Sequence, residues 1–101
     1  SLYVRVTLTK EEAYKGDSTV KRAIVNYVGG FDSDEIEYSG LKLGSDVIYS
    51  RVVGAIMCLG GIADVKIELS TDNENFIESN IEIEKNTIAR TDFEKIVISY
   101  E

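Results

Sequence analysis

The stretch from Gly40 to Leu69 constrains the fold more than any other part of the chain, because it contains a helix start, a helix stop and a buried strand. Ser45 and Asp46 are residue types that cap helices, and an apolar stripe at helical spacing follows them. The pair Gly60-Gly61 comes next, and glycine often ends helices because it adopts positive φ at little cost. Beyond this pair, apolar and polar residues alternate, which predicts a strand. The helical stripe comprises Ile48, Val52, Ala55, Ile56 and Leu59.

An earlier segment has the same organisation. Its apolar residues recur at a spacing of three and four, which places them on one helical face. Asp17 or Ser18 can cap its first turn, and Gly29-Gly30 can end it. We therefore expect a helix from about Ser18 to Val28. Its apolar face comprises Val20, Ala23, Ile24, Tyr27, Val28 and Phe31.

Four stretches alternate apolar and polar residues with the period of two that is typical of a half-buried strand: 2–8, 65–69, 81–84 and 96–100. The acidic segment from Phe31 to Ser39 is predicted to be a loop with a short extended piece. The element order is then β-α-α-β-β-β, with room for a short extra strand near residues 40–44. The predicted fold class is α+β, a two-layer sandwich with two helices packed on one face of a mainly antiparallel sheet of about four strands.

Two residues of the second predicted helix need an explanation. Gly54 lies inside the helix, where glycine costs roughly 1 kcal/mol relative to alanine. A close approach of another backbone, from the first helix or from a neighbouring subunit, would account for it. Cys58 is the single cysteine and cannot form an intramolecular disulfide. Its apolar neighbours predict that it is a small buried hydrophobic residue.

The composition argues against several classes of function. The chain has no histidine, which removes the commonest general base near neutral pH and the commonest transition-metal ligand. It has no phosphate-binding loop, dinucleotide fingerprint or nucleophile-elbow pattern. Its net charge of −7 disfavours contacts with a nucleic-acid backbone. No apolar run is long enough for a membrane helix, and no signal-peptide pattern opens the chain. We expect no catalytic residues, no cofactor, and neither nucleic acid nor membrane as a partner.

Two acidic clusters, Asp32 to Glu37 and Asp72 to Asn75, supply oxygen atoms that could bind a cation. Both lack the alternating ligand order, central glycine and terminal bidentate glutamate of a calcium loop. A solvated loop is the favoured interpretation of each cluster. Adventitious binding of calcium or magnesium is the alternative.

The segment from Thr71 to Asn80 is longer than a usual hairpin connection and carries two apolar residues between polar neighbours. The favoured interpretation is that these side chains fold back as a lid on the edge of the core. Alternatively, the loop inserts into a neighbouring subunit, since aromatic residues often anchor interfaces. Together with the outer face of the second helix, this loop defines the candidate interface residues Tyr49, Arg51, Gly54, Phe76 and Ile77.

The order and spacing of these segments resemble the C-terminal domain of the baseplate J-like family, whose members are wedge proteins in the baseplates of contractile phage tails. Nearly the whole chain takes part in the resemblance. It is carried by Gly-Leu-Lys-Leu-Gly at 40–44 and the helix and strand that follow, by Tyr3 to Leu8 with a helix ending Asn26-Tyr27-Val28, and by the segments 80–83, 87–90 and 96–98.

The resemblance implies a structural component of a phage or prophage tail baseplate that supports assembly by protein–protein contacts, without catalysis. Its partners would be other wedge or tail proteins and copies of the full-length protein. The location would be the virion tail, or the bacterial cytoplasm during prophage expression. Residues 1–101 would be one domain excised from a longer polypeptide, since the chain starts at Ser1 and enters a strand at once. The isolated domain is expected to be monomeric.

Two other classes of function stay open. One is a generic α+β module that binds a protein or peptide unrelated to phage tails, through a sheet edge or the groove between the helices. The other is an enzyme or small-molecule domain that uses the acidic loops. It would require a well-formed pocket with converging carboxylates.

Overall fold

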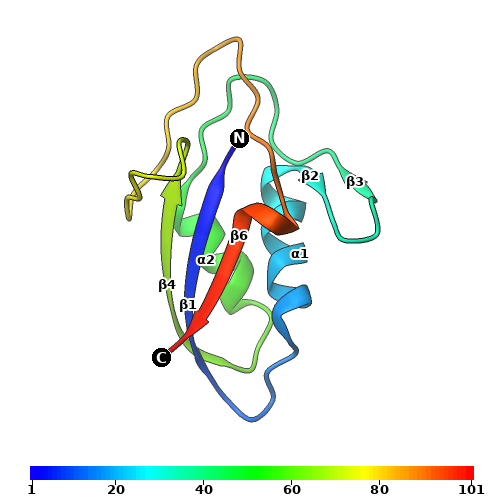
Figure 1. The fold of residues 1–101 in the computed structure, drawn as a ribbon, viewed down its shortest axis with the longest axis vertical. Coiled ribbons are helices and arrows are strands. Elements are labelled where there is room, and N and C mark those ends of the chain that lie inside the picture. The colour runs from blue at the N-terminus through cyan, green and yellow to red at the C-terminus, as the bar shows by residue number, and fades with distance from the viewer.

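The structure, a computed structural model that describes residues 1–101, is an α+β domain whose main sheet is built around the first strand, β1 (Tyr3–Lys10). β1 pairs antiparallel with β4 (Ile62–Ser70) and parallel with β6 (Ile96–Tyr100), in the order β4-β1-β6 (Figure 1). These strands confirm three of the four predicted ones. The fourth, at residues 81–84, is not a strand, because Ile81 makes only a single bridge to Val47. The main sheet is therefore three-stranded and mixed, rather than four-stranded and mainly antiparallel.

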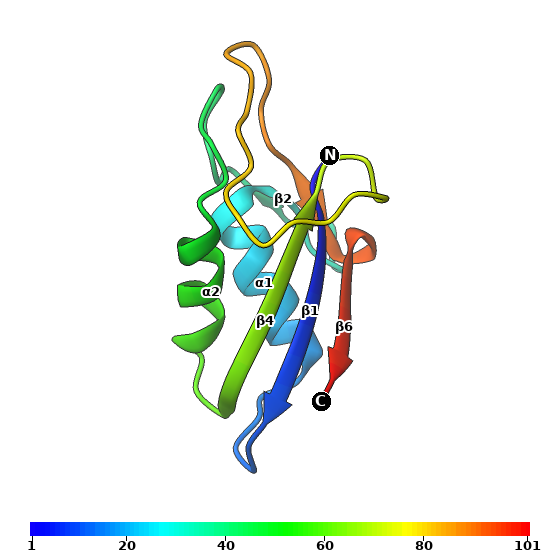
Figure 2. The same cartoon turned by 90° about the vertical axis from the view of Figure 1, so that its left-hand side faces the viewer.

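The helices α1 (Asp17–Val28) and α2 (Tyr49–Met57) cover one face of this sheet (Figure 2). Successive side chains of a strand point to opposite faces, so Val4, Val6 and Leu8 of β1 all point toward the helices and are almost completely buried. Each such side chain contributes roughly 1.5 to 3 kcal/mol by leaving water. Neither helix has the length and apolar character needed to cross a membrane.

A second, small sheet lies beside α1. It consists of β2 (Gly30–Phe31), β3 (Glu37–Tyr38) and β5 (Thr91–Asp92), in the order β3-β2-β5. A single helical turn, η1 (Phe93–Lys95), connects β5 to β6. The acidic segment thus contains the short extended piece that was predicted, whereas residues 40–44 form no strand.

The bounds of α1 confirm its predicted extent and its glycine stop. Gly29 has a φ of 102° and donates its backbone N–H to the carbonyl of Val25. The predicted cap is wrong, however, because the N-cap position is Gly16 and no side chain caps the helix. The carboxylate of Asp17 accepts tyrosine hydroxyls instead, and Ser18 makes no capping bond.

The start of α2 also differs from the prediction. Ser45 and Asp46 do not cap it, because the helix begins only at Tyr49, with Ile48 at the N-cap position and no local side-chain cap. The backbone N–H of Tyr49 donates instead to Oδ1 of Asn80, at 2.7 Å. A side chain 31 positions away in the sequence therefore takes the role of the cap.

The structure corrects the interpretation of two residues in and after α2. A Cβ atom added to Gly54 would meet nothing within 4 Å, so the backbone of α1 does not approach this position. The alternative, a neighbouring subunit, stays a prediction. Cys58 is exposed rather than buried. The buried residues of α2 are Val52 and Ile56, one helical turn apart, and Cys58 lies two positions beyond this row, where a side chain points away from the core.

Candidate functional site

Two long connections rise side by side from one end of the main sheet and project past the N-terminus (Figures 1 and 2). We call residues 40–48 and 80–88 the loop arm. Val47 and Ile81 exchange both backbone hydrogen bonds at 3.0 Å, and Gly44 donates its N–H to the carbonyl of Thr87 at 2.7 Å. The arm is thus braced along its length. It contributes to the elongated shape of the molecule, 43 × 28 × 21 Å.

A polar side chain reinforces this bracing. The carboxylate of Asp46 accepts the backbone N–H of Ile83 at 2.8 Å. At the base of the arm, the guanidinium group of Arg90 donates to the carbonyls of Val28 and Leu41, at 3.2 and 3.0 Å. These contacts connect the arm to the C-terminal end of α1.

The arm exposes apolar side chains. Leu43 is 61% exposed and Ile88 is 39% exposed. Single exposed apolar residues are common on protein surfaces, but a projecting segment can bring them into contact with another molecule. Sequence reasoning missed Leu43, Ile88 and Arg90. The available signal was a leucine between Lys42 and Gly44, in a segment without helical or strand periodicity.

Three of the predicted interface residues lie on α2. Tyr49 and Gly54 are half-buried, and Arg51 is exposed. Tyr49 also packs against the hydrophobic core. The helix therefore leaves Arg51 as the most accessible of the three.

The other two predicted interface residues lie away from the α2 surface. The guanidinium carbon of Arg5 is 3.8 Å from the centre of the Phe76 ring. Arg5 alternates with the buried residues of β1, so this contact lies on the face of the sheet opposite the helices. Ile77 is 43% exposed, and its backbone pairs with Leu69 of β4. The loop folds back onto the sheet, and its insertion into a neighbouring subunit stays a prediction.

The first acidic cluster is organised as a turn around Asp32. Its carboxylate is almost fully buried and accepts the backbone N–H groups of Asp34 and Ile36 at 2.9 and 3.0 Å. The hydroxyl of Tyr38 donates to the same carboxylate at 3.0 Å. Desolvation raises the pKa of Asp32, but these hydrogen bonds outweigh it, and the pKa is lowered.

The second acidic cluster repeats this arrangement. The carboxylate of Asp72 accepts the backbone N–H groups of Asn75 and Glu74, at 2.8 and 2.9 Å. These bonds, together with those from the Asn75 side chain and the Ser70 hydroxyl, hold the pKa of Asp72 well below its usual range. No three His, Cys, Asp or Glu side chains are grouped so that they could hold a metal ion. In both clusters, the aspartate carboxylate accepts backbone N–H groups and so stabilises the turn in which it lies.

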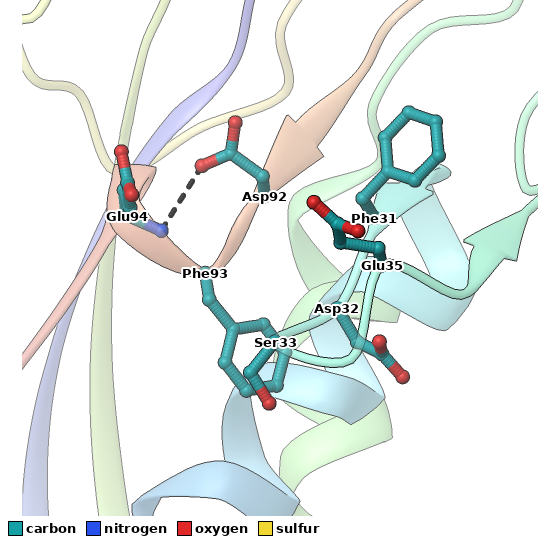
Figure 3. A pocket seen from close by; sticks show the side chains of 7 residues that line it. All are labelled: Phe31, Asp32, Ser33, Glu35, Asp92, Phe93 and Glu94. Carbon is teal, nitrogen blue, oxygen red and sulfur yellow. Dashed lines mark hydrogen bonds between the residues drawn. The ribbon is translucent and has the colours of Figure 1, made fainter.

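The largest cleft, of about 770 Å³, lies between the β2–β3 turn and η1 (Figure 3). One of its acidic groups, Asp92, accepts the Glu94 N–H at 3.0 Å and the Lys95 ammonium at 2.7 Å. Burial raises the pKa of Asp92, but the bonds and charge of Lys95 outweigh it, so the pKa is lowered. The carboxylates of Asp32 and Asp92 point away from each other. The cleft is lined by Phe31, Asp32, Ser33, Glu35, Asp92, Phe93 and Glu94.

No protein-family model matches the chain, and the search of curated proteins found no match. The arm, the α2 surface and the cleft are therefore the features on which a function can be argued.

Proposed function

We propose that this chain is a structural component of a contractile phage or prophage tail baseplate, a wedge domain that supports assembly through protein–protein contacts. The observation that carries the proposal is the loop arm, which projects from a small α+β core and exposes Leu43. The resemblance of the sequence to baseplate J-like wedge proteins supports it. Its partners are other wedge or tail proteins and copies of the full-length protein, in the virion or, during prophage expression, in the bacterial cytoplasm.

The internal bracing of the arm favours a role in assembly. Backbone bonds between Val47 and Ile81 and between Gly44 and Thr87 hold its shape without a partner. A segment that is already ordered loses less conformational entropy on binding, so more of the contact energy appears as affinity. The cleft is less suited to catalysis. Asp32 and Asp92 are engaged in their own turns, and their lowered pKa values keep them ionised at neutral pH, which does not suit a general acid.

The arm is tested by placing Leu43→Asn in the full-length protein of its source phage or prophage. We expect few complete baseplates by electron microscopy, about tenfold fewer than in the unmodified element, because a loss of about 1.4 kcal/mol per contact is a factor of ten. Ile36→Asn is the matched control, since Ile36 is 55% exposed but lies outside the arm. Both variants should melt like the unmodified chain. Purified tails without this chain, or normal assembly with Leu43→Asn, would overturn the proposal.

The groove between α1 and α2 favours a second candidate, a peptide-binding module unrelated to phage tails. It has a volume of about 440 Å³ and is lined mostly by apolar residues, among them Ala23, Tyr27, Ala55 and Leu59. The two candidates differ in their genomic surroundings and in location. Tail-tube, sheath and spike genes beside this one favour the baseplate. Two observations together would favour the module. The chain would be absent from purified tails, and its backbone amide NMR signals at Ala55 and Leu59 would shift when an apolar peptide is added.

A further inference from the structure

The two edges of the main sheet differ in how they are protected. Unpaired strand edges tend to pair with other chains, and proteins block them with charges, bulges or covering segments. The β4 edge has such protection: it carries Asp64, Lys66 and Glu68, and the backbone of Ile77 pairs with Leu69 near its end. The β6 edge has no charged residue between Ile96 and Tyr100 and no covering segment.

The free hydrogen-bonding groups of β6 can be assigned from its pairing. Glu101 donates its N–H to the carbonyl of Leu8, at 2.8 Å. Backbone groups of a strand point to alternate sides, so Ile98 and Tyr100 direct their N–H and C=O groups away from β1. β1 is the only strand that pairs with β6. The outer edge is also apolar, since Val97 is 58% exposed and Tyr100 is 47% exposed.

Contacts with the rest of the chain hold the end of this strand in place. The hydroxyl of Tyr100 donates to the carboxylate of Asp17, at the start of α1. The ammonium group of Lys10 lies 3.9 Å from the centre of the Tyr100 ring, and the ring of Tyr14 meets that of Tyr100 edge-on. The β6 edge is therefore fixed in an extended conformation and needs little reordering to accept another strand.

We propose that β6 pairs antiparallel with β6 of a second copy of this chain, about a two-fold axis at Ile98, so that the two main sheets become one continuous sheet. In this register Ile98 exchanges both backbone bonds with its copy, and Tyr100 N–H donates to the carbonyl of Ile96. The N–H of Ile96 stays with the carbonyl of Phe93 in its own chain.

The charged residues at the two ends of β6 favour the register centred on Ile98. Centring the axis on Ile98 places Val97 of each copy opposite Ser99 of the other. It also brings Glu101 of each copy next to Lys95 of the other, the last residue of η1, whose ammonium group also bonds to Asp92. Centring it on Val97 or on Ser99 would place an uncharged residue opposite Glu101. The pairing does not depend on the proposed baseplate function, and it replaces the expectation of a monomeric domain.

Sedimentation equilibrium of the chain tests this pairing. Because a strand-edge contact is small, we expect association between about 10 μM and 1 mM, with the mass rising from 11.2 kDa toward twice that value. Val97→Glu should weaken it at least tenfold, since the new carboxylate lies beside Arg5 in its own chain but near Glu101 of the copy. Ala63→Glu, on the exposed β4 edge, makes the same charge change and should leave the association unchanged.

Two further experiments keep the proposal testable if Val97→Glu fails to fold. Glu101→Lys would lie next to Lys95 of the copy and should also weaken the association. In a Cys58→Ser background, a mixture of Val97→Cys and Ser99→Cys chains should form mixed disulfides faster than either chain alone, because facing non-hydrogen-bonded residues have the shortest Cβ separation. Three outcomes would overturn it. They are a mass of 11.2 kDa at all concentrations, equal effects of Val97→Glu and Ala63→Glu, and disulfides that form preferentially between two Ser99→Cys chains.

Discussion

Two glycines of this chain differ in whether the structure requires them. Gly30 has a φ of 139°, and a Cβ there would lie 1.7 Å from the carbonyl oxygen of Thr91, so the β2–β5 contact requires glycine. Gly54 lies in a helix with open space around it. Both positions are glycine in the sequence, but only the first has a structural reason within this chain.

This difference predicts opposite effects of alanine. Gly54→Ala should raise the free energy of unfolding by about 0.5 to 1 kcal/mol, because alanine favours the helix. Gly30→Ala should lower it by about 2 kcal/mol or more, because the backbone of Thr91 has to move. Urea unfolding followed by circular dichroism measures both. Equal stability of the two variants would contradict the packing around Gly30.

The buried carboxylate of Asp32 predicts a dependence of stability on pH. Its pKa is lowered in the folded chain, so its contribution is present above the unfolded pKa of about 3.9 and is lost as the pH falls through the folded pKa. Asp32→Asn should therefore be less stable than the unmodified chain at pH 7, and this gap should narrow at pH 3. Thermal melts at both values test this. A gap that widens on acidification would mean that the carboxylate is not the group responsible.

At the scale of elements, the loop arm and α2 depend on each other. The N-terminal turn of α2 has no local cap. The backbone N–H of Tyr49 donates to Asn80 of the arm, and that of Ile48 donates to the hydroxyl of Tyr27 from α1. The carboxylate of Asp46, which was expected to cap the helix, bonds to Ile83 instead. The connection before α2 thus belongs to the arm, and the helix starts where the arm joins it.

The cap provided by Asn80 is testable by alanine substitution. Asn80→Ala should cost about 1 kcal/mol of folding stability, the usual cost of losing an N-cap. Asn86→Ala is the matched control, because Asn86 is exposed on the same arm and its side chain makes no hydrogen bond within the chain. Chemical denaturation compares the two variants. A loss that is the same for both would assign the effect to the arm in general rather than to the cap.

At the scale of the whole molecule, one hydrophobic core joins both helices to the main sheet and includes Val47 and Ile81 of the loop arm. Ile67 of β4 and Ile24 of α1 are completely buried in this core. The second sheet and the arm lie at the same end of the domain (Figure 1). The arm and β6 therefore each contribute buried residues to the core, while Leu43 and Val97 are exposed to solvent.

The extent of the core predicts which apolar residues tolerate a charge. Ile67→Asp should abolish cooperative unfolding, because an ionised group without a partner cannot be accommodated in the core. Ile88→Asp, on the arm, should unfold cooperatively with a stability within about 0.5 kcal/mol of the unmodified chain. Differential scanning calorimetry of both variants tests this. A normal melt of Ile67→Asp would show that the wrong face of β4 has been placed in the core.

The sequence by itself determined α1, the core of α2, and the strands β1, β4 and β6, because apolar periodicity reports which face of each element is buried. The tertiary structure alone decided the parallel pairing of β6, the arm in place of a fourth strand, and the exposure of Cys58 and Leu43. It also decided the cap of α2. The partners in these features lie far apart in the chain, as Tyr49 and Asn80 do, and local periodicity carries no information about which distant segments meet.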